Sequence, residues 1–234
     1  MSDLNRTARM TGALYLGLAI TGALGFLLVR PAIYVTGDPA ATAKNLVEHE
    51  ALARLGVVLE LAIVLTQALT AVWFYKLFRS LNPVAAGSLA AFGFVNAVAI
   101  LGSAAFMATA AAVASDASLA PGGDVAATTQ LLYELSQKFW GVGALFFGLW
   151  LIPMGYIALS AGPLPRALGW TLIVGGLGYV VSALLSNGLA GAPRWLVDGL
   201  GLPATVGELW TIGYLLFVGI RTPTEASPAG CSRA

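Results

Sequence analysis

Six separate runs of about 20 or more mostly apolar residues constrain this chain more than any other feature of its sequence. A helix that crosses the hydrocarbon core of a bilayer needs about 20 such residues. The runs cover residues 10–29, 55–75, 84–114, 139–159, 167–186 and 203–220. They predict an all-α polytopic membrane protein, a six-transmembrane-helix bundle with short amphipathic loop helices.

The composition of the chain agrees with a membrane location. Apolar residues make up 58% of the 234 and charged residues only 10%, whereas soluble domains carry about 25% charged residues. A net charge of +1 without a Lys/Arg cluster argues against a nucleic-acid partner. The single histidine, His49, and the single cysteine, Cys231, form no ligand group. We therefore expect no metal site and no cofactor.

The apolar runs define one membrane domain, residues 1–221, followed by a polar tail, residues 222–234, which we expect to be disordered. The first run follows Arg6 and Arg9, as the apolar core of a signal peptide does. Its apolar core is longer than the roughly 7–15 residues of a signal sequence. A retained first span is therefore favoured over a cleaved signal.

Several residues between the runs predict where helices begin and end. Opposite charges at i,i+4 predict a short helix over residues 40–54. Asp124 is expected to cap a helix that leads into the fourth span. Pro203 is expected to open the sixth span, because helices tolerate proline in their first turn.

Six spans place both chain termini on one side of the membrane. Seven of the twelve Lys and Arg residues fall on that side, and five fall on the other: Arg30, Lys44, Arg54, Lys138 and Arg194. This bias in basic residues favours an orientation with both termini in the cytoplasm. The membrane is expected to be the plasma membrane.

Two carboxylates lie within the apolar runs and are the first candidates for a functional site. Glu60 lies in the second span and Glu208 in the sixth, each about 7–8 Å below the expected outer end of its helix. A carboxylate at membrane depth is costly unless it is protonated, paired or facing a wet cavity. We therefore expect the two to share a pocket in the outer leaflet.

Other polar and aromatic residues are candidates for the same pocket. Gln67 shares a helix face with Glu60, and Asn96 of the third span is expected to reach a similar level. Trp140 and Trp210 are candidate ligand contacts, although aromatic residues often form interfacial belts. Three cations are expected at the pocket mouth: Arg54, Lys138 and Arg194. A purely structural alternative pairs Glu60 with one of these cations or bonds it to Asn96.

Three segments of the second half resemble a known family: residues 148–156 (GLWLIPMGY), 160–169 (SAGPLPRALG) and 176–179 (GLGY). They are similar to six-pass bacterial membrane proteins catalogued as domain of unknown function 4386. Segments near the two ends agree: residues 7–12, 37–38 and 207–208. The resemblance covers nearly the whole chain and implies a fold and a membrane location, but no reaction. This chain is neutral at Gly93, Asn96 and Ser182, where the family often carries charge.

Three functions remain open from the sequence. The first is a transporter or membrane binding protein in which the two carboxylates titrate as a small lipophilic or protonatable ligand binds. The second is an intramembrane enzyme, such as a terpene cyclase, in which Glu60 or Glu208 is the catalytic acid on an isoprenoid-like substrate. The third is a membrane scaffold or assembly partner with no site. The lipid bilayer is an expected partner in all three cases. The sequence carries no indication of the oligomeric state.

Overall fold

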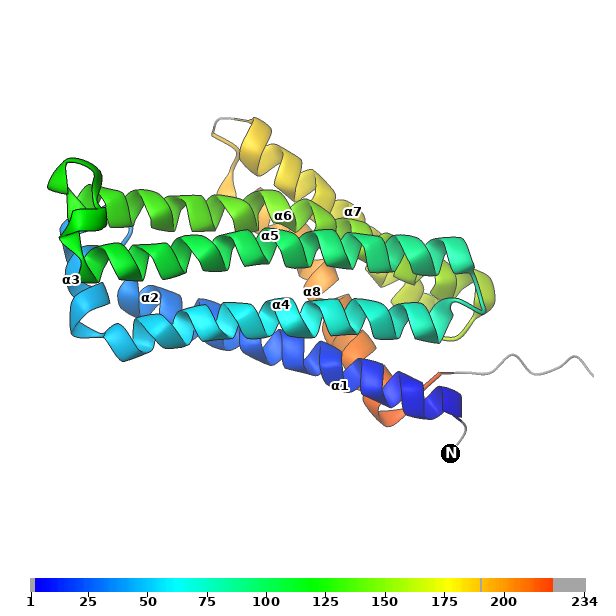
Figure 1. Ribbon diagram of the computed structural model, residues 1–234. Helices are drawn as coiled ribbons and strands as arrows, with labels where there is room; N and C mark the ends of the chain where they lie inside the picture. The colour runs from blue at the N-terminus through cyan, green and yellow to red at the C-terminus, as the bar shows by residue number, and fades with distance from the viewer. Residues whose placement is uncertain (1–2, 190, 221–234) are drawn as a thin grey trace, which may run out of the picture.

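The computed structural model describes residues 3–189 and 191–220, and within these ranges the chain is helical, without a strand (Figure 1). Six segments are long and apolar enough to cross a membrane. The first is Asp3–Ile33, which joins α1 (Asp3–Leu24), the π-helical turn η1 (Gly25–Val29) and α2 (Arg30–Ile33). The others are α4 (Glu50–Phe78), α5 (Pro83–Ser115), α6 (Val125–Ala161), α7 (Arg166–Gly188) and α8 (Arg194–Phe217). The tail predicted to be disordered lies outside the described residues.

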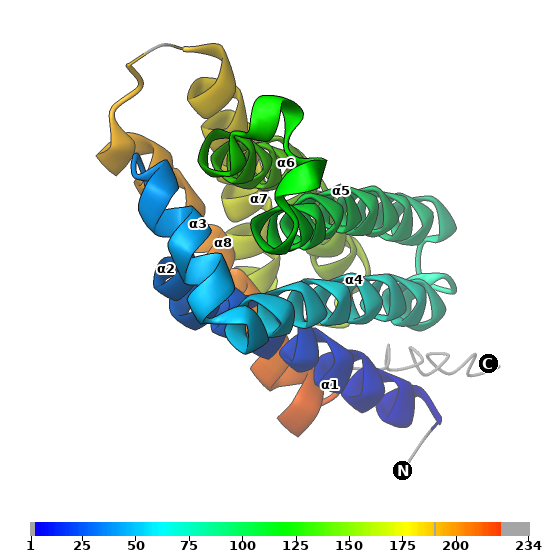
Figure 2. The ribbon, with the colours of Figure 1, turned by 60° about the vertical axis from the view of Figure 1, so that its left-hand side comes forward.

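The spanning helices form a closed circuit in which each packs against its neighbours in the chain. Contacts run from α4 through α5, α6 and α7 to α8, and the circuit closes because α1 packs against both α8 and α4. The long helices α4, α5 and α6 run alongside one another, with α1 below α4 (Figures 1 and 2). The start of α1 and the end of α8 lie at the same end of the bundle, where the backbone N–H of Ile220 donates to Asn5. Six spans and adjacent termini agree with the predicted topology.

Polar residues in the connections start the helices that the sequence predicts. The short helix α3 (Pro39–Glu48) begins at Asp38, and α5 begins at Asn82; both caps precede a proline. Asp124 accepts a hydrogen bond from the backbone N–H of Ala127 at 2.9 Å, which confirms it as the cap of α6. An acceptor side chain at this position satisfies a backbone donor that the helix leaves unpaired.

Glycines bring α6 and α7 into backbone contact. A Cβ placed on Gly148 would lie 2.5 Å from the carbonyl oxygen of Gly176, and one on Gly176 would lie 2.7 Å from that of Gly148. About two helical turns further along α6, Gly155 meets the Gly169 carbonyl in the same way. Small residues allow this approach between membrane helices. The neighbouring helices α6 and α7 are thereby held at van der Waals contact.

Two helix boundaries differ from the sequence prediction. The connecting helix ends at Glu48, so Arg54 belongs to the first turns of α4. The sixth helix begins at Arg194, so Pro203 lies inside it and does not open it. The turn around Pro203 rests on glycines of α7, because Gly175 lies against the backbone of Ala204 and Gly178 against Leu200. This close packing holds the helix together although proline removes one backbone hydrogen bond.

Candidate functional site

A buried ion pair joins the first span to the second. The guanidinium of Arg30 donates from Nη2 to Glu60 Oε1, and the two side chains are only 5% and 2% exposed. The prediction that Arg30 lies among the charges of an outer connection is wrong, because its side chain is buried. Nor does Glu60 pair with any of the three cations considered for it. Burying either charge alone would be strongly unfavourable, and each compensates the other.

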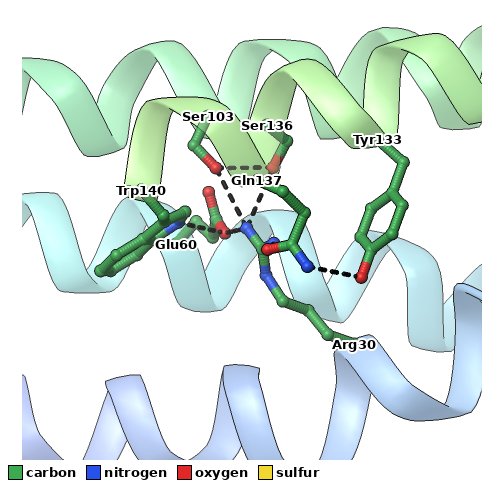
Figure 3. Close-up of polar contacts among 7 residues, drawn as sticks. All are labelled: Arg30, Glu60, Ser103, Tyr133, Ser136, Gln137 and Trp140. Atoms are coloured by element: carbon green, nitrogen blue, oxygen red, sulfur yellow. Dashed lines mark hydrogen bonds and ion pairs between the residues drawn. The ribbon is translucent and has the colours of Figure 1, made fainter. Parts of the chain in front are cut away.

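Polar side chains of α5 and α6 complete the surroundings of Arg30 (Figure 3). Nη2 also donates to the hydroxyls of Ser103 and Ser136 at 3.0 Å each, and Nη1 donates to Gln137 at 2.7 Å. Gln137 in turn donates to the hydroxyl of Tyr133 at 2.8 Å. The charge of Arg30 is therefore solvated by side chains of three helices, α4, α5 and α6, in place of water. We name Arg30, Glu60, Ser103, Ser136 and Gln137 the ion-pair centre.

A local irregularity in the first span places Arg30 in the interior. Pro31 has no N–H and its ring would collide with the carbonyl of Leu27 in a regular α-helix. The preceding turn is widened to a π-helix, in which the backbone N–H of Arg30 bonds to Gly25, five residues earlier. Single π turns of this kind are frequent at functional sites.

Phe26, which belongs to the same π-helical turn, lies against the ion-pair centre together with Trp140. The ring of Phe26 lies under the Arg30 guanidinium at 4.7 Å and meets Trp140 edge-to-face at 4.5 Å. The indole N–H of Trp140 donates to Glu60 Oε1 at 3.1 Å. These two rings form a wall with the ion pair on one side.

A cavity of about 280 Å³ lies on the other side of that wall. Helices α1, α4, α6 and α8 line it, and its surface is mostly apolar and aromatic. The lining residues are Tyr15, Leu18, Ala19, Gly22, Phe26, Ile63, Trp140, Phe147, Thr205, Glu208, Leu209 and Ile212. Its size and chemistry are those of a pocket for a small ligand.

Glu208 supplies the carboxylate of this cavity. The hydroxyl of Tyr15 donates to Glu208 Oε1 at 2.6 Å, which joins α1 to α8 across 193 positions of the chain. The half-buried side chain of Glu208 faces the cavity, and the indole of Trp150 lies near the same carboxyl group. Among the described residues, the ion pairs are Arg30–Glu60, Lys44–Glu48 and Arg54–Glu50, so none of them includes Glu208.

The two carboxylates lie at different levels of the bundle. Their partners on the first span, Arg30 and Tyr15, are about four helical turns apart, on the order of 22 Å along the axis. The expectation of equal depth assumed that the sixth helix begins at Pro203, whereas it begins at Arg194. Glu60 lies behind Trp140 and does not line the cavity, while Glu208 does.

Gln67 and Asn96, the other polar candidates, lie in a separate part of the interior. Both are buried between α4 and α5, and neither side-chain amide has a hydrogen-bond partner in the described part of the chain. The Gln67 amide lies beside Gly93, and the Asn96 carbonyl lies near Gly143 of α6. They do not line the Glu208 cavity.

The remaining candidates lie at the surface. Trp210 is 40% exposed and does not line the cavity. Arg54 donates to Glu50 at 2.5 Å, and Lys138 and Arg194 are exposed; none of the three lines the cavity. The predicted pocket mouth formed by these three cations is therefore wrong for this cavity.

Two stacked tyrosines lie beside the ion-pair centre. Tyr34 stacks on Tyr133 with the ring centroids 4.0 Å apart. Burial raises the pKa of the Tyr34 phenol well above its ordinary value, so this group is neutral at physiological pH. No group of His, Cys, Asp and Glu among the described residues could hold a metal ion.

The six helices of spanning length, with a buried ion pair between the first and second of them, define an integral membrane protein of the multi-pass helical class. The chain belongs to the family described as Domain of unknown function (DUF4386), whose model matches residues 10–219. No curated protein and no solved structure matches the chain.

Proposed function

We propose that this membrane protein binds a small lipophilic ligand in the cavity between α1, α4, α6 and α8, as a carrier or a binding protein. The observation that carries the proposal is the cavity itself, about 280 Å³ of mostly apolar space with one carboxylate on its wall. Pockets of this kind bury most of a small ligand's surface and orient it with a few polar groups. Glu208, held by Tyr15, is that polar group here.

The exposure of residues on the cavity wall supports entry from the bilayer. Thr205 and Leu209 on α8 are exposed, and Ala19 on α1 is half-buried at the facing edge. All three lie well inside spanning helices. A ligand that partitions into the membrane reaches these residues without crossing water.

A cavity-filling substitution tests the proposal. Gly22 lines the cavity, and a Cβ placed there would meet nothing within 4 Å, so Gly22→Leu puts a side chain into the ligand's space. The matched control is Gly213→Leu on α8, where a Cβ is equally free but does not line the cavity. We expect 1-bromonaphthalene to quench Trp140 saturably in the wild type and in Gly213→Leu, and to bind Gly22→Leu at least about tenfold more weakly, about 1.4 kcal/mol.

Equal quenching in the two variants would show mere partition into the lipid or detergent, and the proposal would fall. The variant Trp140→Phe assigns the quenching to Trp140. It removes the fluorescent side chain next to the cavity without adding volume, so the saturable quenching should disappear.

A second candidate is acid catalysis on an isoprenoid-like substrate. It is favoured by one observation, the combination of a carboxyl group with the aromatic rings of Tyr15, Trp140 and Phe147 around one apolar cavity. Such rings stabilise positive charge. Incubation of the purified protein with a panel of polyprenyl substrates tests it: a new product that Glu208→Gln abolishes supports catalysis, and an unchanged lipid profile removes it.

A further inference from the structure

We propose that the ligand of this cavity carries a positive charge, and that Glu208 releases one proton for each cation bound. The inference rests on the proposed function, since it names the ligand class of the same cavity. It starts from a difference between the two carboxylates of the interior.

The protein supplies a counter-charge to one carboxylate and not to the other. Arg30 neutralises Glu60 within the ion-pair centre. Glu208 receives only the neutral phenol of Tyr15 and lies near the neutral indole of Trp150. The charge that would balance an ionised Glu208 is therefore left to whatever occupies the cavity.

Several helices pack against Glu208, and within residues 3–189 and 191–220 none of the groups facing it is a cation. On α1 the facing group is Tyr15, and on α7 it is the phenol of Tyr179. From α4 the nearest residue on the cavity wall is Ile63, and the Glu60 charge beyond Trp140 is already paired with Arg30. An isolated carboxylate at membrane depth is unfavourable, so the empty cavity favours the protonated acid.

Aromatic rings give the cavity a second feature that suits a cation. Tyr15, Phe26, Trp140 and Phe147 line it, and the rings of Trp140 and Phe147 stack 6.2 Å apart. Aromatic faces attract ammonium groups most strongly where water is excluded, as in the cages that bind quaternary amines. An anionic head would meet a carboxyl group and no cation on this wall. The fitting ligand is a lipophilic ammonium ion.

The exchange balances in charge and atoms. In the empty state the Glu208 carboxyl group is neutral; when an ammonium ion binds, the O–H bond breaks, the proton leaves to solvent and the carboxylate pairs with the cation. The total charge in the cavity stays at zero in both states. The hydroxyl of Tyr15 donates a hydrogen bond to Oε1 of this carboxylate.

The experiment compares two probes of nearly the same shape on the purified full-length protein. Benzyltrimethylammonium has a permanent charge and no proton of its own, and neopentylbenzene is its neutral carbon isostere. We expect the cation to release about one proton into a weakly buffered solution, and its affinity to rise about tenfold per pH unit while Glu208 is protonated in the empty state. The affinity of the neutral probe should not change with pH.

Variants assign the effect to Glu208. Glu208→Gln should lose the proton release and weaken cation binding at least tenfold, while still binding neopentylbenzene. Glu134→Gln, an exposed position on α6, is the matched control and should behave as the wild type. Tyr15→Phe should move the pH dependence of cation binding to higher pH, because it removes the donor to the carboxylate. The proton release of the wild type decides the matter even if Glu208→Gln does not fold.

The outcomes separate this inference from the proposed function. Saturable binding of the neutral probe without binding of the cation would leave a lipophilic pocket and overturn the ammonium ligand. Cation binding without proton release would overturn the exchange. Binding of neither probe would count against the pocket itself.

Discussion

At the scale of single residues, the interior holds two carboxylates with opposite arrangements. Glu60 is locked by Arg30, two serines lie beside the guanidinium, and Trp140 closes the group. Glu208 has one donor and open space in front of it. The first arrangement suits a structural role, and the second leaves a polar group that can respond to a ligand.

The ion-pair centre makes a prediction about stability. Removing one partner of a buried pair leaves an uncompensated charge, which costs about 3–5 kcal/mol. We expect Arg30→Met or Glu60→Leu alone to destabilise the protein by about that amount. The double variant should recover much of the loss, because it removes both charges.

The surface pair Arg54–Glu50 is the internal control for this measurement. Its side chains are 75% and 54% exposed, so Arg54→Met should change stability by at most about 1 kcal/mol. Thermal or denaturant unfolding in one detergent compares the variants. Equal losses for Arg30→Met and Arg54→Met would show that burial does not strengthen the pair.

The sequence predicted a carboxylate at membrane depth but not the residue that pairs with it. Arg30 follows an apolar run and precedes proline, a pattern that is typical of the end of a span. Its burial depends on partners up to 107 positions away and on a π turn that no local pattern predicts. The bond from Tyr15 to Glu208 spans 193 positions and is invisible to periodicity for the same reason.

At the scale of elements, the glycines of α6 and α7 set how closely these helices approach. Gly148→Ala would place a methyl group 2.5 Å from the backbone carbonyl of Gly176, which has no flexible side chain to move away. Overpacking of this kind costs about 1–3 kcal/mol. We expect a clear fall in the midpoint of thermal unfolding.

Gly141→Ala on the same helix is the control. A Cβ at Gly141 meets nothing within 4 Å, so alanine should be neutral or stabilising by up to about 1 kcal/mol through helix propensity. If Gly148→Ala were as stable as Gly141→Ala, the two backbones would have to be further apart than the structure places them.

The elements themselves were the most predictable part of the chain. Apolar length identified all six spans, and the cap at Asp124 followed from residue chemistry. The start of α8 was predicted nine residues too late, because Pro203 and the polar residues before it are typical of a loop. The helix there is explained only by its contact with glycines of α7. That contact joins two helices, so the local sequence of α8 does not reveal it.

At the scale of the whole molecule, the burial of Arg30 increases the difference in the number of Lys and Arg residues between the two sides of the membrane. Arg30 is 4% exposed and belongs to the interior, so it no longer counts among the cations of the side opposite the termini. Four of the five basic residues first assigned to that side remain outside the ion-pair centre: Lys44, Arg54, Lys138 and Arg194. The excess on the terminal side grows accordingly, which favours cytoplasmic termini.

The single cysteine of the chain allows a direct test of this orientation. We expect a membrane-impermeant maleimide to leave Cys231 unlabelled in intact cells and to label it after the membrane is opened. The converse probe is Cys231→Ala combined with Ser118→Cys in the connection between α5 and α6, which should be labelled in intact cells. Labelling of Cys231 from outside would reverse the orientation.

The closure of the circuit by α1 and α8 has a consequence for how the protein is made. The first helix and the last helix together supply the hydrogen bond from Tyr15 to Glu208 and much of the cavity wall. During synthesis, Tyr15 enters the membrane long before Glu208 is translated. The binding site is therefore completed only when α8 inserts into the membrane. A chain that stops before α8 lacks Glu208 and part of the cavity wall, so it cannot bind the ligand.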